Sequence, residues 1–67
     1  MNDLVLHNKL KEFRTKAKLS QQELADKVGT TRQTIIAIEK GTFSPTAKLA
    51  LLLTYALDCT FEQLFYF

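Results

Sequence analysis

Residues that break helices are scarce in this chain, and their positions divide it into short segments. Among the 67 residues there are two glycines, Gly29 and Gly41, and one proline, Pro45. Between these breakers, apolar residues recur at the spacing of amphipathic helices, as Leu10 and Phe13 do near the start. The sequence therefore predicts an all-α fold built from several short helices joined by tight turns.

Capping residues mark where the expected helices begin and end. Two pairs have the spacing of capping boxes, in which each residue satisfies a free backbone amide of the other: Ser20 with Glu23, and Thr60 with Gln63. A glycine after a helix favours a left-handed C-terminal cap, and serine followed by proline, as at positions 44 and 45, favours a helix start. The five expected helices span about 8–17, 21–28, 31–40, 45–57 and 61–65.

The expected helix at 45–57 carries apolar residues on almost every side, which is typical of a helix in the middle of a bundle. The two ends, 4–6 and 65–67, are instead β-prone and could pair as a small ribbon. Residues 1–67 are expected to form a single domain, because a chain of this length holds one core.

Size and composition exclude several classes of protein. The single cysteine, Cys59, cannot form an intrachain disulfide, and with His7 alone it cannot build a structural zinc site. The chain has no signal peptide, and its most apolar stretch is too short to span a bilayer, so we expect a cytoplasmic protein without a membrane partner. It also lacks a glycine-rich phosphate loop and a nucleophile spaced with its base. We therefore expect no enzyme activity, no metal, no cofactor and no small-molecule ligand.

Positive charge is concentrated in the first third of the chain. The net charge is +2, five of the basic residues lie between 9 and 18, and none follows Lys48. This asymmetry suggests an anionic partner at the positive end. A solvated helix face explains the same cluster equally well, so charge alone leaves both interpretations open.

The segment from Ser20 to Gly41 has the spacing of a helix-turn-helix. Its turn is too short for antiparallel packing, so the two helices are expected to cross at a steep angle. In that motif the second helix lies in the major groove of DNA, and its N-terminal residues meet the base edges. Arg32 has the guanidinium fork that binds guanine, and Gln33 has the amide that pairs with adenine. Ile36 would face outward, where it could touch a thymine methyl group.

Each of these residues also has a plainer interpretation. Short polar side chains are common at helix starts because they cap the free amides. Thr31 is therefore expected to cap its helix, to contact DNA, or to do both. Arg32 and Gln33 could form a solvated helix start, although the surrounding motif favours DNA contact. Exposure without any contact is the alternative for Ile36.

These residues resemble the helix-turn-helix of the phage Cro and lambda-repressor-like family of Xre-type regulators. The resemblance covers about residues 9–65 and extends through Pro45 to the FEQLF ending. Within the helix-turn-helix, the residues that match the family pattern are Gln21, Glu23, Leu24, Ala25, Val28, Thr31, Gln33, Ile35, Ile38, Glu39, Lys40 and Gly41. In length the chain is also similar to short stand-alone bacterial repressors. The resemblance implies a five-helix domain that binds double-stranded operator DNA as a homodimer.

The resemblance also implies roles for individual residues. Arg32 and Gln33 match positions that contact bases, and Thr31 and Thr34 match positions near the DNA backbone. Gln21, Lys40 and Thr42 match positions that contact phosphates. Gln21 would be helped by the N-terminus of its helix. Arg14 and Glu39 match an ion pair that ties the third helix to the first. Ile36 and Ala37 stand where several relatives carry polar, base-reading side chains, so DNA shape is expected to contribute to recognition.

A second copy of the chain is expected near the fifth helix. One small module buries little surface on DNA, and two-fold pairing is the usual remedy. The family places self-association near this helix and the loop before it, where the chain has Asp58, Thr60 and Phe61. Ser44 is expected to lie close by. For Phe61, a core contact with an aromatic residue at 43 or 55 is the alternative.

The expected function is that of a sequence-specific repressor that binds a palindromic operator as a homodimer. The alternative is an antitoxin-like or regulatory protein-interaction module of the same fold. Arg32 and Gln33, together with Gln21 and Lys40, favour DNA, because a module without a DNA partner would not need this set.

Overall fold

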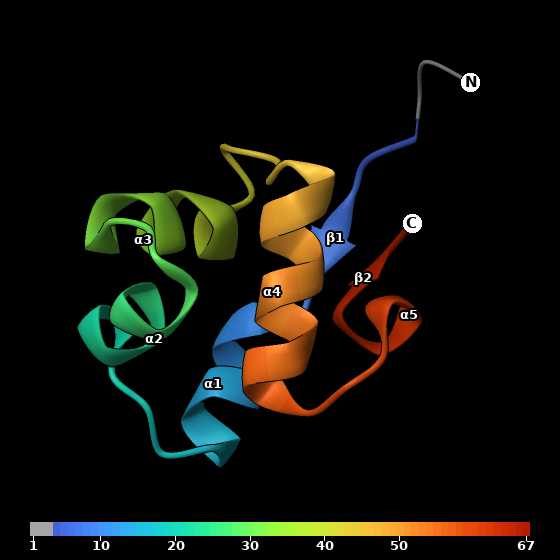
Figure 1. The fold of residues 1–67 in the computed structure, drawn as a ribbon. Helices are drawn as coiled ribbons and strands as arrows, with labels where there is room; N and C mark the ends of the chain where they lie inside the picture. The colour runs from blue at the N-terminus through green and yellow to red at the C-terminus, as the bar shows by residue number, and fades with distance from the viewer. Residues whose placement is uncertain (1–3) are drawn as a thin grey trace.

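The computed structural model describes residues 4–67, which form five helices and a short two-stranded ribbon (Figure 1). The elements are, in order, β1 (His7–Asn8), α1 (Leu10–Lys16), α2 (Gln21–Val28), α3 (Arg32–Lys40), α4 (Ala47–Leu57), α5 (Phe61–Leu64) and β2 (Phe65–Tyr66). Figure 1 shows α2 and α3 on one side of α4, and the ribbon and α5 on the other. The predicted five-helix, all-α fold is confirmed.

The caps of α2 and α5 are the ones that the sequence predicts. The Ser20 hydroxyl accepts the Glu23 N–H at 3.0 Å, and the Glu23 carboxylate accepts the Ser20 N–H at 2.8 Å. The same reciprocal box, between Thr60 and Gln63, opens α5. Gly29 ends α2 in the left-handed region with φ 73°, where a residue with a Cβ would be strained. These local signals fix α2 at the bounds predicted for it.

The start of α4 differs from the prediction. Ser44 is not the cap and Pro45 is not the first helical residue, because α4 begins at Ala47 with Thr46 as its N-cap. The Thr46 hydroxyl accepts the Leu49 N–H at 3.1 Å, which satisfies a backbone amide that Ser44 lies too far back to reach. Pro45 therefore lies in the loop, one residue before the cap.

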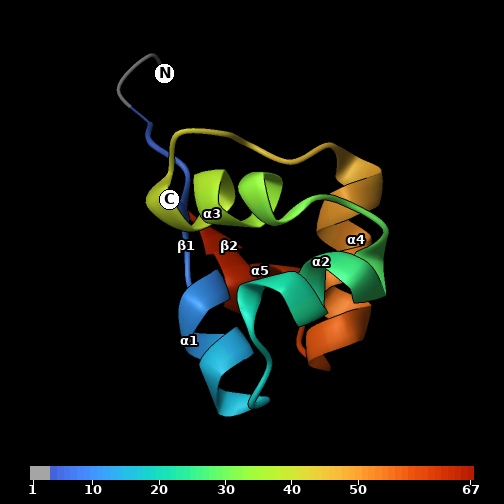
Figure 2. The ribbon, with the colours of Figure 1, turned by 90° about the vertical axis from the view of Figure 1, so that its left-hand side faces the viewer.

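α4 packs between α2 and α5, as expected for a helix in the middle of the bundle, but it is not covered on all sides. Only Ala50, Leu53, Thr54 and Leu57 of this helix are buried. Tyr55 is 82% exposed and Leu51 is 52% exposed, so one side of the helix faces solvent. Figure 2 shows the reason, because α4 stands at the edge of the molecule with no helix on its outer side. A helix with this position can carry apolar residues all round only by exposing some of them.

The terminal ribbon is present, with a shifted N-terminal strand. His7 pairs with Tyr66 and Asn8 with Phe65 in an antiparallel register, whereas Leu4 and Val5 lie outside the strand and are exposed. Because residues 7 and 8 are used by the ribbon, α1 begins at Leu10 rather than at 8. Phe65 likewise belongs to β2, so α5 ends one residue earlier than predicted.

Every helix contributes to one core. The fully buried large side chains are Leu10, Leu24, Ile35, Ile38, Leu53 and Leu64. Two of them belong to α3, and they fix its rotation, because a helix that buries Ile35 and Ile38 turns its first polar turn toward solvent. The core therefore determines which side chains of α3 are available to a partner.

Candidate nucleic-acid interface

The polar start of α3 is exposed. Thr31, Arg32 and Gln33 are all accessible, while Thr34 is half-buried. Thr31 is the N-cap of α3, and its hydroxyl accepts the Thr34 N–H at 3.2 Å. The capping interpretation of Thr31 is therefore confirmed, and Arg32 and Gln33 follow directly as the first helical residues.

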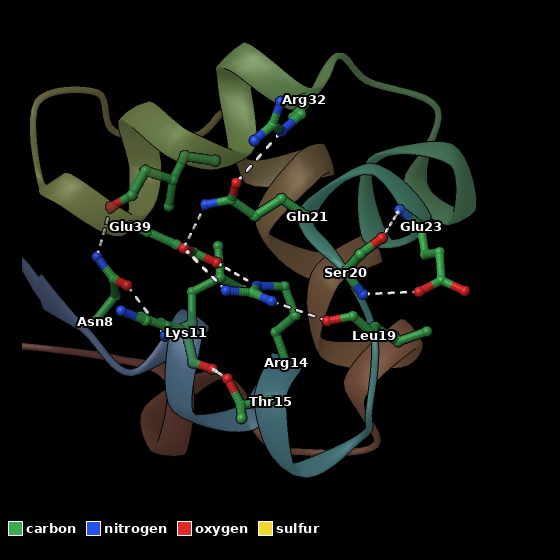
Figure 3. A network of polar contacts seen from close by, with 12 residues as sticks. Asn8, Lys11, Arg14, Thr15, Leu19, Ser20, Gln21, Glu23, Arg32 and Glu39 are labelled. Atoms are coloured by element: carbon green, nitrogen blue, oxygen red, sulfur yellow. Dashed lines mark hydrogen bonds and ion pairs between the residues drawn. The ribbon is translucent and has the colours of Figure 1, made fainter.

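A network of polar contacts holds this exposed start (Figure 3). Arg14 on α1 donates through Nε to Glu39 Oε2 at 2.7 Å. Glu39 also accepts from Gln21 Nε2 at 3.1 Å, and Gln21 Oε1 in turn accepts from Arg32 Nε at 3.4 Å. The network thus runs from α1 through the C-terminal end of α3 to the first residue of α2, and ends on the arginine at the start of α3.

Arg14 and Glu39 form an ion pair that is nearly removed from solvent. Their side chains are 12% and 7% exposed. Arg14 also donates through Nη1 to the Leu19 carbonyl at 2.8 Å, so both arms of its guanidinium are occupied by the protein. Loss of one partner from such a pair leaves an uncompensated charge in a poorly solvated place. The arrangement fits a residue that fastens α1 to α3 rather than one that reaches a partner.

Gln21 has both ends of its side-chain amide engaged. Its amino group donates to Glu39 and its oxygen accepts from Arg32. Gln21 therefore connects the Arg14–Glu39 ion pair to the exposed Arg32. The guanidinium of Arg32 uses only Nε in this contact. Its two terminal amino groups lie at the exposed end of the side chain, where a guanine or a phosphate could accept from both.

A hollow of about 550 Å³ opens on the surface beside this network. Its lining consists of Lys11, Arg14, Ser20, Gln21, Gln22 and Arg32. Lys11 and Arg32 carry positive charges that are not paired with a carboxylate of the described residues, whereas the charge of Arg14 is balanced by Glu39. None of the lining residues carries a carboxylate, so the hollow favours anions. It also lies at the N-terminus of α2, where the helix dipole adds to the positive potential.

The C-terminal end of α3 carries the other residues expected near DNA. Lys40 is exposed in the last turn, and Gly41 caps the helix with φ 79°. Thr42 closes the end, because its backbone N–H and its hydroxyl both donate to the Ala37 carbonyl, at 3.0 and 3.2 Å. Ile36, expected to face outward, is only partly exposed.

Of the residues expected at a dimer surface, Asp58, Thr60 and Phe61 lie just before α5 or at its start, whereas Ser44 lies before α4, at the opposite end of that helix. Ser44, Asp58 and Thr60 are exposed, and Phe61 is 45% exposed. The aromatic ring beside Phe61 is that of Phe65, at 5.4 Å between centroids. Each of the four candidates is therefore accessible to a second molecule.

Cys59, in the loop before α5, is a free and half-buried thiol. Burial raises its pKa, and the negative charge of Asp58 adds to the effect. A thiol with a raised pKa is mostly protonated at neutral pH and is a poor nucleophile.

α4 carries a further exposed apolar surface, which was not predicted from the sequence. Leu51, Leu52 and Tyr55 are large exposed side chains of this helix. A signal was present in the sequence, since Lys48 precedes them by three, four and seven residues. That spacing places all four on one side of a helix, and a lysine marks the side that faces solvent. The number of leucines in the segment hid this signal.

Within residues 4–67, no group of three or more His, Cys, Asp or Glu side chains is arranged to hold a metal ion. None of the helices in this part of the chain has the length and apolar character needed to cross a membrane.

Comparison with known proteins agrees with this geometry. A helix-turn-helix family model matches residues 10–64. An uncharacterized HTH-type transcriptional regulator of Methanocaldococcus jannaschii is 45% identical over 60 residues, covering 90% of this chain and 91% of the relative. The uncharacterized HTH-type transcriptional regulator YgzD of Bacillus subtilis is 43% identical over 61 residues, covering 91% and 92%. The crystal structure of the restriction-modification controller protein C.AhdI from Aeromonas hydrophila is similar with a TM-score of 0.75 and 33% identity, covering 81% of this chain and 78% of that one.

The chain belongs to the helix-turn-helix family. It is a DNA-binding transcription regulator of the Cro/C1 type, a class of regulators rather than of enzymes.

Proposed function

We propose that this chain represses transcription by binding a palindromic operator as a homodimer, with α3 in the major groove and residues 1–67 acting as one domain. The observation that carries the proposal is the exposed start of α3, where Arg32 and Gln33 stand free of the core. Arg32 is braced there by Gln21 through the contact of 3.4 Å. A braced arginine loses less conformational freedom on binding than a mobile one, which favours specific contact with a base.

The proposed contacts divide into two groups. Arg32 and Gln33 read base edges, with Ile36 beside them at the groove. The DNA backbone is contacted near the start of α3 by Gln21, Thr31 and Thr34, and near its end by Lys40 and Thr42. The cationic hollow beside Gln21 supports this division, because a phosphate would find Lys11, Arg32 and the N-terminus of α2 around it.

Repression is the simplest outcome of such binding. A domain that occupies a promoter blocks polymerase without any further activity.

The homodimer is supported by the apolar side chains that the fold leaves uncovered. Leu51, Leu52 and Tyr55 on α4 and Phe61 at the start of α5 are exposed, and exposed groups of large apolar residues commonly mark an interface. Ser44, Asp58 and Thr60 supply polar groups for its rim. A second copy on this side of the molecule would leave α3 free for DNA.

Selection of bound duplexes from a random DNA library tests the proposal. The wild-type protein is expected to enrich a palindrome, and Arg32→Ala to lose the preference at one symmetric position. Lys40→Ala is the control: loss of a phosphate contact is expected to weaken binding to all sequences without changing the preference. Binding that is sensitive to salt but enriches no sequence would contradict the proposal, because it would show backbone attraction alone.

A protein-interaction module is the second candidate, because the exposed apolar surface of α4, where Tyr55 is 82% exposed, fits a different protein as well as a second copy of this chain. The same experiment separates the two functions. A chain whose main partner is another protein is expected to enrich no duplex.

A further inference from the structure

We infer that Asn8 is a positioning residue for operator recognition, which fixes the recognition helix α3 to the start of α1 and to the terminal ribbon. The inference rests on the proposed reading of DNA by α3. It assigns a part in recognition to a residue that lies outside the helix-turn-helix and outside the set of expected DNA contacts.

The side chain of Asn8 bridges two helices (Figure 3). Its Nδ2 donates to the Ile38 carbonyl, near the end of α3, at 2.9 Å. Its Oδ1 accepts the Leu10 N–H, at the start of α1, at 3.0 Å. Both contacts are partly buried and have good hydrogen-bond lengths. The orientation of the amide is also determined, because the opposite orientation would set oxygen against oxygen at Ile38.

The backbone of Asn8 is held as firmly as its side chain. Asn8 pairs with Phe65 in the ribbon, and the next residue, Lys9, donates its N–H to the Leu64 carbonyl at 2.9 Å. Asn8 therefore joins three parts of the fold, namely the ribbon, α1 and α3. Its short side chain cannot follow a movement of α3 without breaking one of these contacts.

Asn8 and Arg14 together hold neighbouring residues of α3. Asn8 binds the carbonyl of Ile38, and Arg14 binds the carboxylate of Glu39. The reading residues begin at Arg32, about 9 Å away along the helix axis at 1.5 Å per residue. A tilt of roughly 10° about the anchored end would move that start by about 1.5 Å, which exceeds the precision that a binding constellation requires.

Asn8→Ser tests the inference. Serine has no charge and can still accept the Leu10 N–H in a local turn, but its hydroxyl is too short to donate to Ile38 while it does so. The folded structure is therefore expected to persist. Affinity for the selected operator should fall about tenfold, as the loss of one partly buried hydrogen bond allows, while affinity for random duplex stays within about twofold of wild type.

Two further variants separate the positioning role of Asn8 from a general loss of stability. Asn8→Asp preserves the acceptor for Leu10 but places a carboxylate against the Ile38 carbonyl, so its loss of operator preference should be at least as large. Ala50→Gly is the control for stability, because a glycine inside α4 costs about 1 kcal/mol and leaves the hydrogen bonds of Asn8 and Arg14 to α3 in place. In that control, specific and non-specific binding should change together. Circular dichroism establishes the folded fraction of each variant.

The outcomes distinguish this inference from the function on which it rests. If the Asn8 variants keep the wild-type ratio of specific to non-specific affinity, or lose both affinities in proportion to the folded fraction, Asn8 does not position α3 and the proposed function stands. If the wild-type protein has no preferred operator, both proposals fall. A loss of the ratio in Asn8→Ser that Ala50→Gly does not share supports the inference.

Discussion

At the scale of the single residue, Glu39 connects more of the site than any reading residue does. Its carboxylate accepts three donors, namely Nε and Nη2 of Arg14 at 2.7 and 3.4 Å and the amide of Gln21 at 3.1 Å. Only 7% of its side chain is exposed. Glu39 therefore supports both the attachment of α3 to α1 and, through Gln21, the position of Arg32.

Replacement of Glu39 by glutamine is expected to lower the free energy of unfolding by about 3 kcal/mol, because the buried guanidinium of Arg14 loses its counter-ion. Urea denaturation measures the change. Glu12→Gln is the matched control, since Glu12 is exposed on α1 and should shift stability by less than about 0.5 kcal/mol. A loss in Glu39→Gln no larger than in this control would show that solvent, rather than Glu39, stabilises Arg14.

At the scale of the element, the capping box makes the start of α2 sensitive to acid. The backbone N–H of Ser20 donates to the Glu23 carboxylate and lowers its pKa from the ordinary value of 4.5, and the Ser20 hydroxyl adds to the effect. A lowered pKa means that folding stabilises the charged form. This contribution is complete above pH 4.5 and is lost as the pH falls through the lowered pKa.

Glu23→Gln is therefore expected to reduce the slope of stability against pH in the acid range. Glutamine can still accept the Ser20 N–H, so the cap remains while its titration disappears. Thermal denaturation of both proteins between pH 7 and pH 3 measures the slopes. Parallel curves would mean that other carboxylates account for the acid sensitivity of this chain.

The elements also show how far the sequence alone can lead. The bounds of α2 and its caps were predicted, because Ser20, Glu23 and Gly29 act on their immediate neighbours. The start of α4 was not, because Ser44 and Thr46 are both competent caps and the loop decides between them. The start of α1 was predicted two residues too early for a different reason. Asn8 pairs with Phe65 in the ribbon, and this contact with the far end of the chain is not visible in the local sequence.

The same division holds for the site. The exposure of Arg32 and Gln33 followed from the burial of Ile35 and Ile38, which helical periodicity predicts. The hydrogen bond between Arg32 and Gln21 depends on the angle at which α2 crosses α3. The spacing of residues in the sequence does not determine that angle. Contacts within one turn of helix were therefore predictable from the residues themselves. The Arg14–Glu39 pair between α1 and α3 was predicted through the family resemblance and is present, whereas the contact between Gln21 and Arg32 required the structure.

At the scale of the whole molecule, self-association is expected to depend on the exposed side chains of α4 and α5. Phe61→Asp and Tyr55→Asp should each give a folded monomer, because a charge at the centre of an apolar interface stays unpaired. Sedimentation equilibrium measures the mass in solution. Glu62→Gln, a change at a neighbouring exposed residue, should leave the wild-type state intact.

Light scattering on the same variants provides a second measure of mass. A dimer that survives both aspartate substitutions would place the contact between copies elsewhere on the molecule. Monomers that still bind the operator with full affinity would remove the need for a dimer in recognition.

The ribbon has a consequence for the order in which this protein becomes functional. Because β1 pairs with β2, the segments near the two ends of the described chain lie side by side. Residues 65 and 66 follow all five helices in the chain, so the ribbon cannot form before every helix has been synthesised. Until it forms, Asn8 has no strand to pair with. The chain is therefore expected to discriminate among DNA sequences only after this last element is in place.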